Sequence, residues 1–242
     1  MKLFRLAVTI LLCCNLAAFA ADDKTFFDHV DRFLEVYAHD GRVDYGAIHN
    51  NPERLNTLAR EIAGFDPGKL PEGDPQKAFW INAYNILVIK GIIDHYPTDS
   101  PLSIPGFFKE IKHPVAGQML TLDEIEHERI RAAYGDARIH FALVCAARGC
   151  PPIRNQAYRP EILNAQLETS TRQILNNPAF IRIDPAKKSA AISEIFKWFR
   201  GDFESGGATV RDFINRYLNE DIPGDFTITF YSYDWQLNDS QP

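Results

Sequence analysis

The sequence predicts a single α+β domain that is rich in helices and carries a small, mainly antiparallel sheet. Two observations predict it. The first half contains helical apolar patterns, including the long apolar segment 76–95, which contains no Pro. The second half mixes helical patterns with a few short strand-like runs. Helices separated along the chain from a small sheet are typical of the α+β class. The alternative is two subdomains that meet near residues 96–120.

The first twenty residues have the layout of a secretory signal peptide. Lys2 and Arg5 precede an apolar run over residues 6–19, and Ala18-Phe19-Ala20 has the small-x-small pattern of a cleavage site. The run is shorter than the roughly 20 residues of a membrane-spanning helix, and no later run approaches that length. We therefore expect residues 1–20 to be a signal peptide and residues 21–242 to form one exported domain, periplasmic or secreted, without a membrane span.

Composition excludes several classes of protein. The chain of 242 residues is 45% hydrophobic and 24% charged, which excludes a disordered chain and a coiled coil. Its 26 Lys and Arg against 32 Asp and Glu give a net charge of -6, so we expect no nucleic-acid partner. The Gly-rich phosphate loops, the serine-hydrolase elbow and the zinc-protease motif are absent. We predict no bound cofactor and no resident metal.

Helices are predicted in order over residues 25–38, around 55–62, over 76–95, 122–133, 159–176 and 209–218, from the spacing of their apolar residues. Thr121 and Glu124 form a capping box at the start of the fourth helix. Residues 96–120 contain many Pro and Gly, and we expect a long functional or mobile loop there. Strands are predicted over 139–145 and 226–233, and a hairpin over 180–184 and 190–195.

After removal of the signal peptide the chain keeps two cysteines, Cys145 and Cys150. A thiolate beside an imidazole is a competent nucleophile. On a strand, His140 and Cys145 would point to opposite faces, whereas Cys150 follows a turn at Gly149 and could return toward His140. In an exported chain, however, two cysteines this close most simply form a disulfide, which would remove both nucleophiles. A metal site that uses both thiols with His140 or His127 is a third alternative.

Polar residues on two predicted helices are further candidates. Asn82 and Asn85 lie in an apolar helix, and their amides need hydrogen-bond partners. They either cap loops packed against that helix, or line a cleft and orient a histidine or a substrate amide. Glu124 and His127 share one face of the helix over 122–133, as an acid/base pair or as part of a solvated charged face.

Five segments resemble the exported bacterial members of the family known as domain of unknown function 547. They are FWINAYNILVIKGI (79–92), LTLDEIEHERIR (120–131), HFALVCAARGCPPI (140–153), SEIFKWFRGDF (193–203) and YDWQLN (233–238). The resemblance implies one domain over the mature chain and supplies no activity. At the level of the fold, a helix followed by a strand that begins with His is similar to the papain-like and transglutaminase-like layout. That layout needs a Cys at the start of the helix, which this chain lacks.

The leading hypothesis is a polar cleft lined by Asn82, Asn85, Glu124, His140 and Cys150. As an enzyme, the protein would be a thiol-dependent amide or ester hydrolase or acyl transferase. Cys150 would be the nucleophile, His140 the base, and one of the two Asn amides the oxyanion-binding group. The alternative is a binding module with a Cys145–Cys150 disulfide, which holds a peptide or an envelope component with the cleft and the Phe107–Phe108 loop. A metal-binding protein is the third hypothesis.

Overall fold

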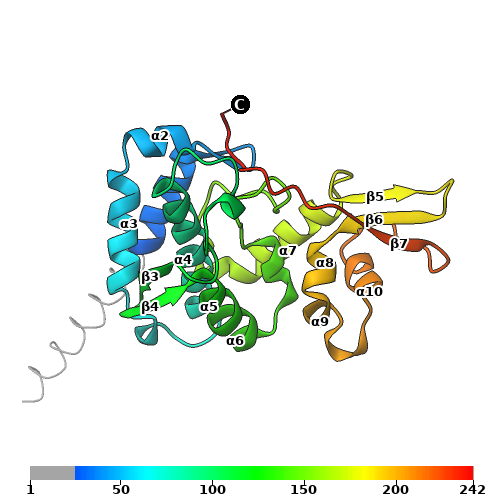
Figure 1. Ribbon diagram of the computed structural model, residues 1–242. Coiled ribbons are helices and arrows are strands. Elements are labelled where there is room, and N and C mark those ends of the chain that lie inside the picture. Colours follow the sequence, from blue (N-terminus) through cyan, green and yellow to red (C-terminus); the bar gives the residue numbers. More distant parts are fainter. Residues whose placement is uncertain (1–24, 242) are drawn as a thin grey trace, which may run out of the picture.

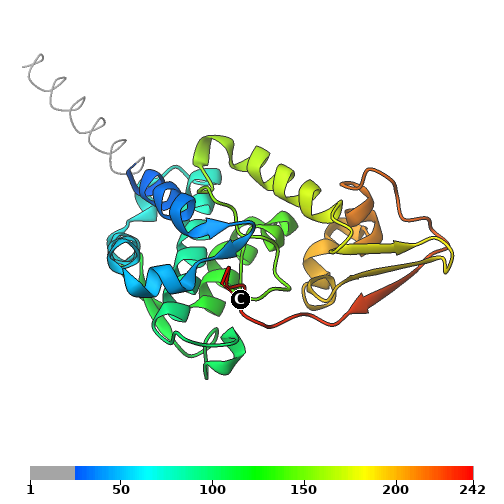
Figure 2. The ribbon, with the colours of Figure 1, turned by 90° about the horizontal axis from the view of Figure 1, so that it is seen from above.

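The computed structural model describes residues 25–241, so the predicted signal peptide, residues 1–20, lies outside the described residues. A larger helical part and a smaller lobe lie side by side (Figures 1 and 2). The larger part contains α2–α7, and the smaller lobe contains β5–β7 with α8–α10. About half of residues 25–241 are helical and the sheets are small, which confirms the predicted α+β class. No helix within residues 25–241 is long and apolar enough to cross a membrane.

Helix α4, Asp74–Ile93, is the centre of the larger part. Its apolar residues occur on all sides, so the helix is buried over nearly its whole length, as the segment 76–95 predicts. Helices α2 (Tyr45–Asn50), α3 (Glu53–Gly64) and α7 (Leu163–Leu175) pack against it. Residues 25–37 are helical and contribute to the same core.

The helix predicted over 122–133 begins at the predicted capping box and has an irregular middle. Regular turns α5 (Leu122–Glu124) and α6 (Ala132–Tyr134) flank a π-helical segment, Ile125–Arg131. A π-helical turn contains an extra residue, so the residues that share a face differ from those expected for a regular helix.

Part of the predicted loop 96–120 is a β-hairpin. Strands β3 (Lys112–Val115) and β4 (Gln118–Thr121) pair antiparallel around Ala116 and Gly117, which both have positive φ. Such a two-residue turn is the preferred connection of a hairpin. The hairpin was not predicted because Pro114 lies inside β3 and Pro usually indicates a loop, but Pro is tolerated at the edge of a two-stranded sheet.

The strand predicted over 139–145 is wrong. Residues Ala137–Phe141 form a 3₁₀ turn, and the chain then continues as a loop. Short apolar runs occur both in buried strands and in other buried segments, so the pattern alone does not separate them. Here the backbone of Ala142 and Val144 bonds to the side chain of Asn85 instead of to a neighbouring strand.

The smaller lobe is built on a three-stranded sheet. The predicted hairpin is present as β5 (Ile181–Asp184) and β6 (Ser189–Ser193), and β7 (Thr227–Tyr231) pairs parallel to β6. Helices α8 (Ile195–Trp198), α9 (Arg200–Phe203) and α10 (Val210–Asn215) lie on one side of it (Figure 1). A two-stranded pair, β1 (Ala38–His39) and β2 (Arg42–Val43), lies in the larger part.

After β7 the chain returns to the larger part as an extended C-terminal segment, residues 232–241 (Figure 1). Its backbone bonds to the loop over residues 145–150: Gly149 N donates to Asp234 O at 2.8 Å, and Asn238 N donates to Ala146 O at 2.9 Å. Farther along, Val43 N donates to Asn238 O at 3.1 Å. The C-terminal segment therefore connects the smaller lobe to the larger part, and its backbone hydrogen bonds hold the loop over residues 145–150.

Candidate functional site

A cleft of about 150 Å³ lies between the two parts of the molecule. Its walls come from α4, the helix over 122–134, the segment around 140–151, α8 and the C-terminal segment. The lining residues are Tyr84, Phe108, Asp123, Glu126, His127, His140, Leu143, Cys145, Cys150, Pro151, Ile195, Trp198, Phe199, Tyr233 and Trp235.

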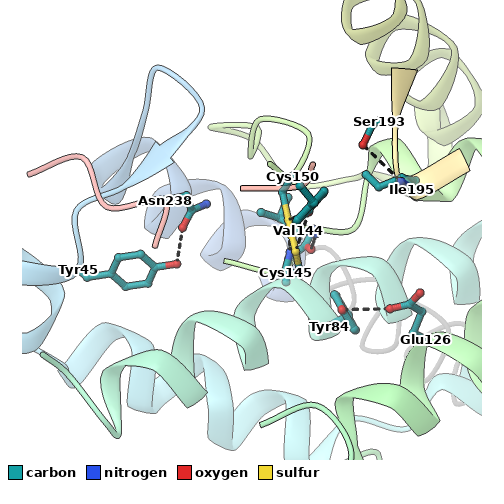
Figure 3. The surroundings of a disulfide bond; sticks show 11 residues. Tyr45, Tyr84, Glu126, Val144, Cys145, Cys150, Ser193, Ile195 and Asn238 are labelled. Atoms are coloured by element: carbon teal, nitrogen blue, oxygen red, sulfur yellow. Dashed lines mark hydrogen bonds between the residues drawn. A yellow bond between two sulfur atoms is a disulfide. The ribbon is translucent and has the colours of Figure 1, made fainter. Parts of the chain in front are cut away.

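A disulfide joins Cys145 and Cys150 on one wall of the cleft, which confirms the predicted bridge (Figure 3). Cys150 is buried, with 9% of its surface exposed, whereas Cys145 is half-buried. The Tyr233 hydroxyl lies 3.1 Å from the sulfur of Cys145 and 3.0 Å from that of Cys150. Burial raises the pKa of Tyr233, so this hydroxyl keeps its proton and is a donor to the sulfur atoms.

The loop between the two cysteines is a tight turn. Ala146 has φ of 63°, a left-handed conformation that is uncommon for a residue other than Gly. Gly149 packs directly under the C-terminal segment, where a Cβ would lie 2.9 Å from the backbone nitrogen of Asp234. The close packing holds both ends of the bridge against the segment that contributes Tyr233.

Two carboxylates lie on the opposite wall. Tyr84 donates its hydroxyl proton to Oε2 of Glu126 at 3.1 Å (Figure 3), and burial and the Glu126 charge both raise the pKa of Tyr84. Nε2 of His127 lies 3.2 Å from Oδ1 of Asp123, and Arg131 donates to Nδ1 of the same ring. Since Arg only donates, the network assigns the proton of His127 to Nε2.

His140 lines the cleft, but its imidazole is already engaged. Nε2 bonds to Oδ2 of Asp202 at 2.7 Å, and the ring stacks on Phe199 with centroids 4.1 Å apart. Arg131 bonds to both oxygens of the same Asp202 carboxylate. The hydrogen bonds from His140 and Arg131 hold the pKa of Asp202 well below its usual range, so the carboxylate stays ionised.

Aromatic side chains close the remaining side. Trp198 stacks on Trp235 with centroids 5.8 Å apart, and the Tyr233 ring lies 4.9 Å from Trp198 and 4.8 Å from Trp235. Trp198 is 43% exposed, which is unusual for so large an apolar side chain. Phe108 comes from the Phe107–Phe108 loop, and its ring centroid lies 6.4 Å from that of Trp235.

Three of the five residues predicted to line the cleft are used elsewhere. The amide of Asn82 bonds to both the backbone nitrogen and the backbone oxygen of Tyr158. Asn85 bonds in the same way to Ala142 O and Val144 N, both at 2.9 Å. Glu124 accepts the Thr121 backbone N–H in the capping box, which lowers the pKa of its carboxyl. These contacts match the alternative in which the two amides cap packed loops, and the three residues do not line the cleft.

Several residues that line the site were not predicted from the sequence. Glu126 was missed because the π-helical segment, which brings it to the cleft together with Asp123 and His127, leaves no clear sequence signal. Trp198 and Tyr233 lie in two of the segments that carry the family resemblance, and this was the available signal. Within residues 25–241, no three His, Cys, Asp or Glu side chains form a group that could hold a metal ion.

Comparison with known proteins gives one match. Residues 69–175 match the model of the family described as Protein of unknown function, DUF547. No curated protein and no solved structure matches the chain. The matched range contains α4, the helix over 122–134 and the disulfide, while α8 and the C-terminal segment lie beyond it. Residues 69–175 therefore belong to the DUF547 family, and they contain three of the five segments that carry the resemblance, 79–92, 120–131 and 140–153.

Proposed function

We propose that this protein is a binding module whose cleft holds an organic cation the size of a side chain, such as the basic side chain of a peptide. The observation that carries the proposal is the pairing of two carboxylates with an aromatic wall. Asp123 and Glu126 line the cleft, and none of the described lining residues is Lys or Arg. Carboxylates in a partly enclosed site concentrate cations.

Glu126 is the better placed carboxylate. Its Oε2 accepts the Tyr84 hydroxyl, while among the described residues no hydrogen bond reaches Oε1. Its charge also contributes to the raised pKa of both Tyr84 and Tyr233, so its potential reaches Tyr233 beside the disulfide. Oε1 is therefore available to accept a hydrogen bond from an ammonium or guanidinium group.

The aromatic wall supports the same ligand class. Trp faces attract cations within about 6 Å, and the exposed Trp198 next to Trp235 offers such a face. A volume of about 150 Å³ is below the roughly 300 Å³ of typical drug-sized pockets, so the cleft suits one side chain and not a whole cofactor.

Titration of tryptophan fluorescence tests the proposal. The probes are the capped peptides acetyl-Gly-Lys-Gly-amide and acetyl-Gly-Arg-Gly-amide, the neutral norleucine peptide of the same length, and free butylamine. We expect saturable binding of the basic peptides that weakens with salt, at least tenfold weaker binding of the norleucine peptide, and intermediate binding of butylamine. Equal binding of the basic and neutral peptides contradicts the proposal. Stronger binding of butylamine than of the peptides identifies a free amine as the ligand.

Glu126→Gln removes the charge and keeps the shape, and we expect it to weaken binding of the Lys peptide about tenfold. Glu128→Gln is the matched control because Glu128 is exposed on the same helix and does not line the cleft. Trp198→Ala tests the aromatic wall separately. Phe230→Ala on β7 is its matched control, because Phe230 is an equally exposed aromatic residue. Equal effects of a variant and its control refute the assigned role.

A second candidate is the thiol-dependent hydrolase or acyl transferase, in a state in which the bridge is reduced. It is favoured by one observation: Cys150 and His140 line the same cleft. With Nε2 of His140 bonded to Asp202, Nδ1 is the nitrogen left to accept a proton. Hydrolysis of a p-nitrophenyl ester by the reduced chain, abolished in Cys150→Ala and absent before reduction, is the expected result. Equal hydrolysis by the oxidised chain rules this activity out.

We also propose that the chain is exported and that residues 1–20 are cleaved off as a signal peptide. The charged and apolar pattern of that segment supports export, and so does a disulfide, which persists in oxidising compartments. Expression of the full chain in a bacterial host should yield a periplasmic or secreted product that begins at Ala21. Leu11→Arg, within the apolar run, should block export and cleavage of the signal peptide. A full-length cytoplasmic product from the unaltered chain contradicts the proposal.

A further inference from the structure

We infer that the Cys145–Cys150 bridge undergoes thiol–disulfide exchange, in which a thiolate of an external dithiol attacks Cys145 and Cys150 is the leaving thiolate. The bridge lies at the edge of the hydrophobic core, where both of its cysteines line the cleft. This activity is independent of the proposed binding of cations.

The two sulfur atoms differ in access. Cys145 is half-buried on the cleft wall, whereas Cys150 has only 9% of its surface exposed and packs in the hydrophobic core. Exchange requires the attacking sulfur to approach one sulfur of the bridge directly. The greater accessibility of Cys145 selects it as the residue whose sulfur is attacked.

The two sulfur atoms also differ in their hydrogen bonds. The backbone N–H of Cys145 donates to Sγ of Cys150 at 2.9 Å, and the Tyr233 hydroxyl donates to the same atom at 3.0 Å. Among the described residues, the one hydrogen-bond partner of Sγ of Cys145 is the same Tyr233 hydroxyl, at 3.1 Å, so the backbone N–H is the additional donor on Cys150. Two donors stabilise a thiolate more than one, and a stabilised thiolate leaves faster. The contacts therefore select Cys150 as the leaving group.

Contacts other than the bridge also hold the loop. Hydrogen bonds from Gly149 N to Asp234 O and from Asn238 N to Ala146 O clamp it to the C-terminal segment. The bond from Asn85 to Val144 N holds the chain just before Cys145. The two thiols therefore stay close after reduction, which allows the bridge to form again.

The exchange transfers two electrons from the dithiol to the bridge. One thiolate of the dithiol forms a bond to Sγ of Cys145, the Cys145–Cys150 bond breaks, and its electron pair stays on Cys150. The second thiol of the dithiol loses its proton and attacks the sulfur now joined to Cys145. The Cys145 thiolate leaves and takes up a proton, and the dithiol is released as a disulfide.

The charges around the cleft make a distinguishing prediction. Asp123 and Glu126 face the bridge wall and oppose a negative charge on Cys150, whereas the Tyr233 hydroxyl favours it. Reduction of the bridge by dithiothreitol under native conditions should therefore become about tenfold slower in Tyr233→Phe and several-fold faster in Glu126→Gln. Tyr231→Phe is the matched control, because the Tyr231 hydroxyl donates to Phe180 O, away from the bridge. A bridge that is reduced only in denaturant overturns the inference, and so do equal rates in Tyr233→Phe and Tyr231→Phe.

The attacked sulfur is identified with glutathione on the native chain. Brief exposure, acid quenching, alkylation and peptide mass mapping should place glutathione on Cys145 and the free thiol on Cys150. Oxidised glutathione should modify Cys145 in Cys150→Ala at least ten times faster than it modifies Cys150 in Cys145→Ala. Glutathione found mainly on Cys150 overturns the inference. The mapping of the unaltered chain decides the matter even where an alanine variant does not fold.

Discussion

Asn85 supports the wall of the cleft that carries the bridge, and Asn85→Leu removes this support with a side chain of the same branching and the same number of heavy atoms. The substitution leaves the carbonyl of Ala142 and the N–H of Val144 buried without the partners they have at 2.9 Å. Each orphaned group costs about 1–3 kcal/mol, or about 4 kcal/mol together. Burial of the apolar Leu side chain returns about 1 kcal/mol. We expect a net loss of about 3 kcal/mol, which most domains survive.

Equilibrium unfolding in urea measures this loss, with an unchanged dependence on urea concentration as the sign that both end states are retained. Asn82→Leu is the matched control, because Asn82 makes the corresponding pair of bonds to Tyr158, away from the bridge. Both variants should lose stability, but only Asn85→Leu should speed reduction of the bridge. A loss below about 1 kcal/mol refutes the reasoning, and so does equal reduction kinetics in the two variants.

Two further predictions concern stability. Burial raises the pKa of Asp136, but the bonds from Arg138 and the buried Lys77 outweigh it and lower this pKa from 3.8 to about 2. The ionised Asp136 should therefore stabilise the fold by about 2 kcal/mol above pH 4, and this contribution should disappear as the pH falls toward 2. The free energies of unfolding in urea of Asp136→Asn and of the unaltered chain should converge near pH 2. Gly149→Ala places a Cβ against the C-terminal segment and should cost about 1–3 kcal/mol. Gly201→Ala should not cost this, because outside its own helix and neighbouring residues no atom lies within 4 Å of the added Cβ. Equal thermal stability of the two variants refutes this packing argument.

The helices and the small hairpin could be predicted because their signals are local. Apolar spacing over 76–95 and the capping box at Thr121 and Glu124 depend on residues within a few turns of each other. The segment 139–145 could not be predicted in the same way. Its apolar residues are buried as in a strand, but its backbone partners come from Asn85, more than fifty residues earlier.

The candidate site was predicted only in part for the same reason. Cys145, Cys150 and His140 were found because cysteine and histidine are chemically distinctive and lie close together in the sequence. The acidic and aromatic walls were not found, since Glu126 depends on the register of a π-helical segment and Trp198 on the packing of the smaller lobe.

The sequence by itself determined the α+β class, the DUF547 match of residues 69–175 and the proximity of two cysteines, because each of these depends on composition, local spacing or short motifs. Only the tertiary structure decided what surrounds the bridge. The C-terminal segment crosses back from β7 and brings Tyr233 to the sulfur atoms, more than eighty residues away along the chain. Contacts of this kind result from the packing of the two parts, for which a short stretch of sequence contains no periodic signal.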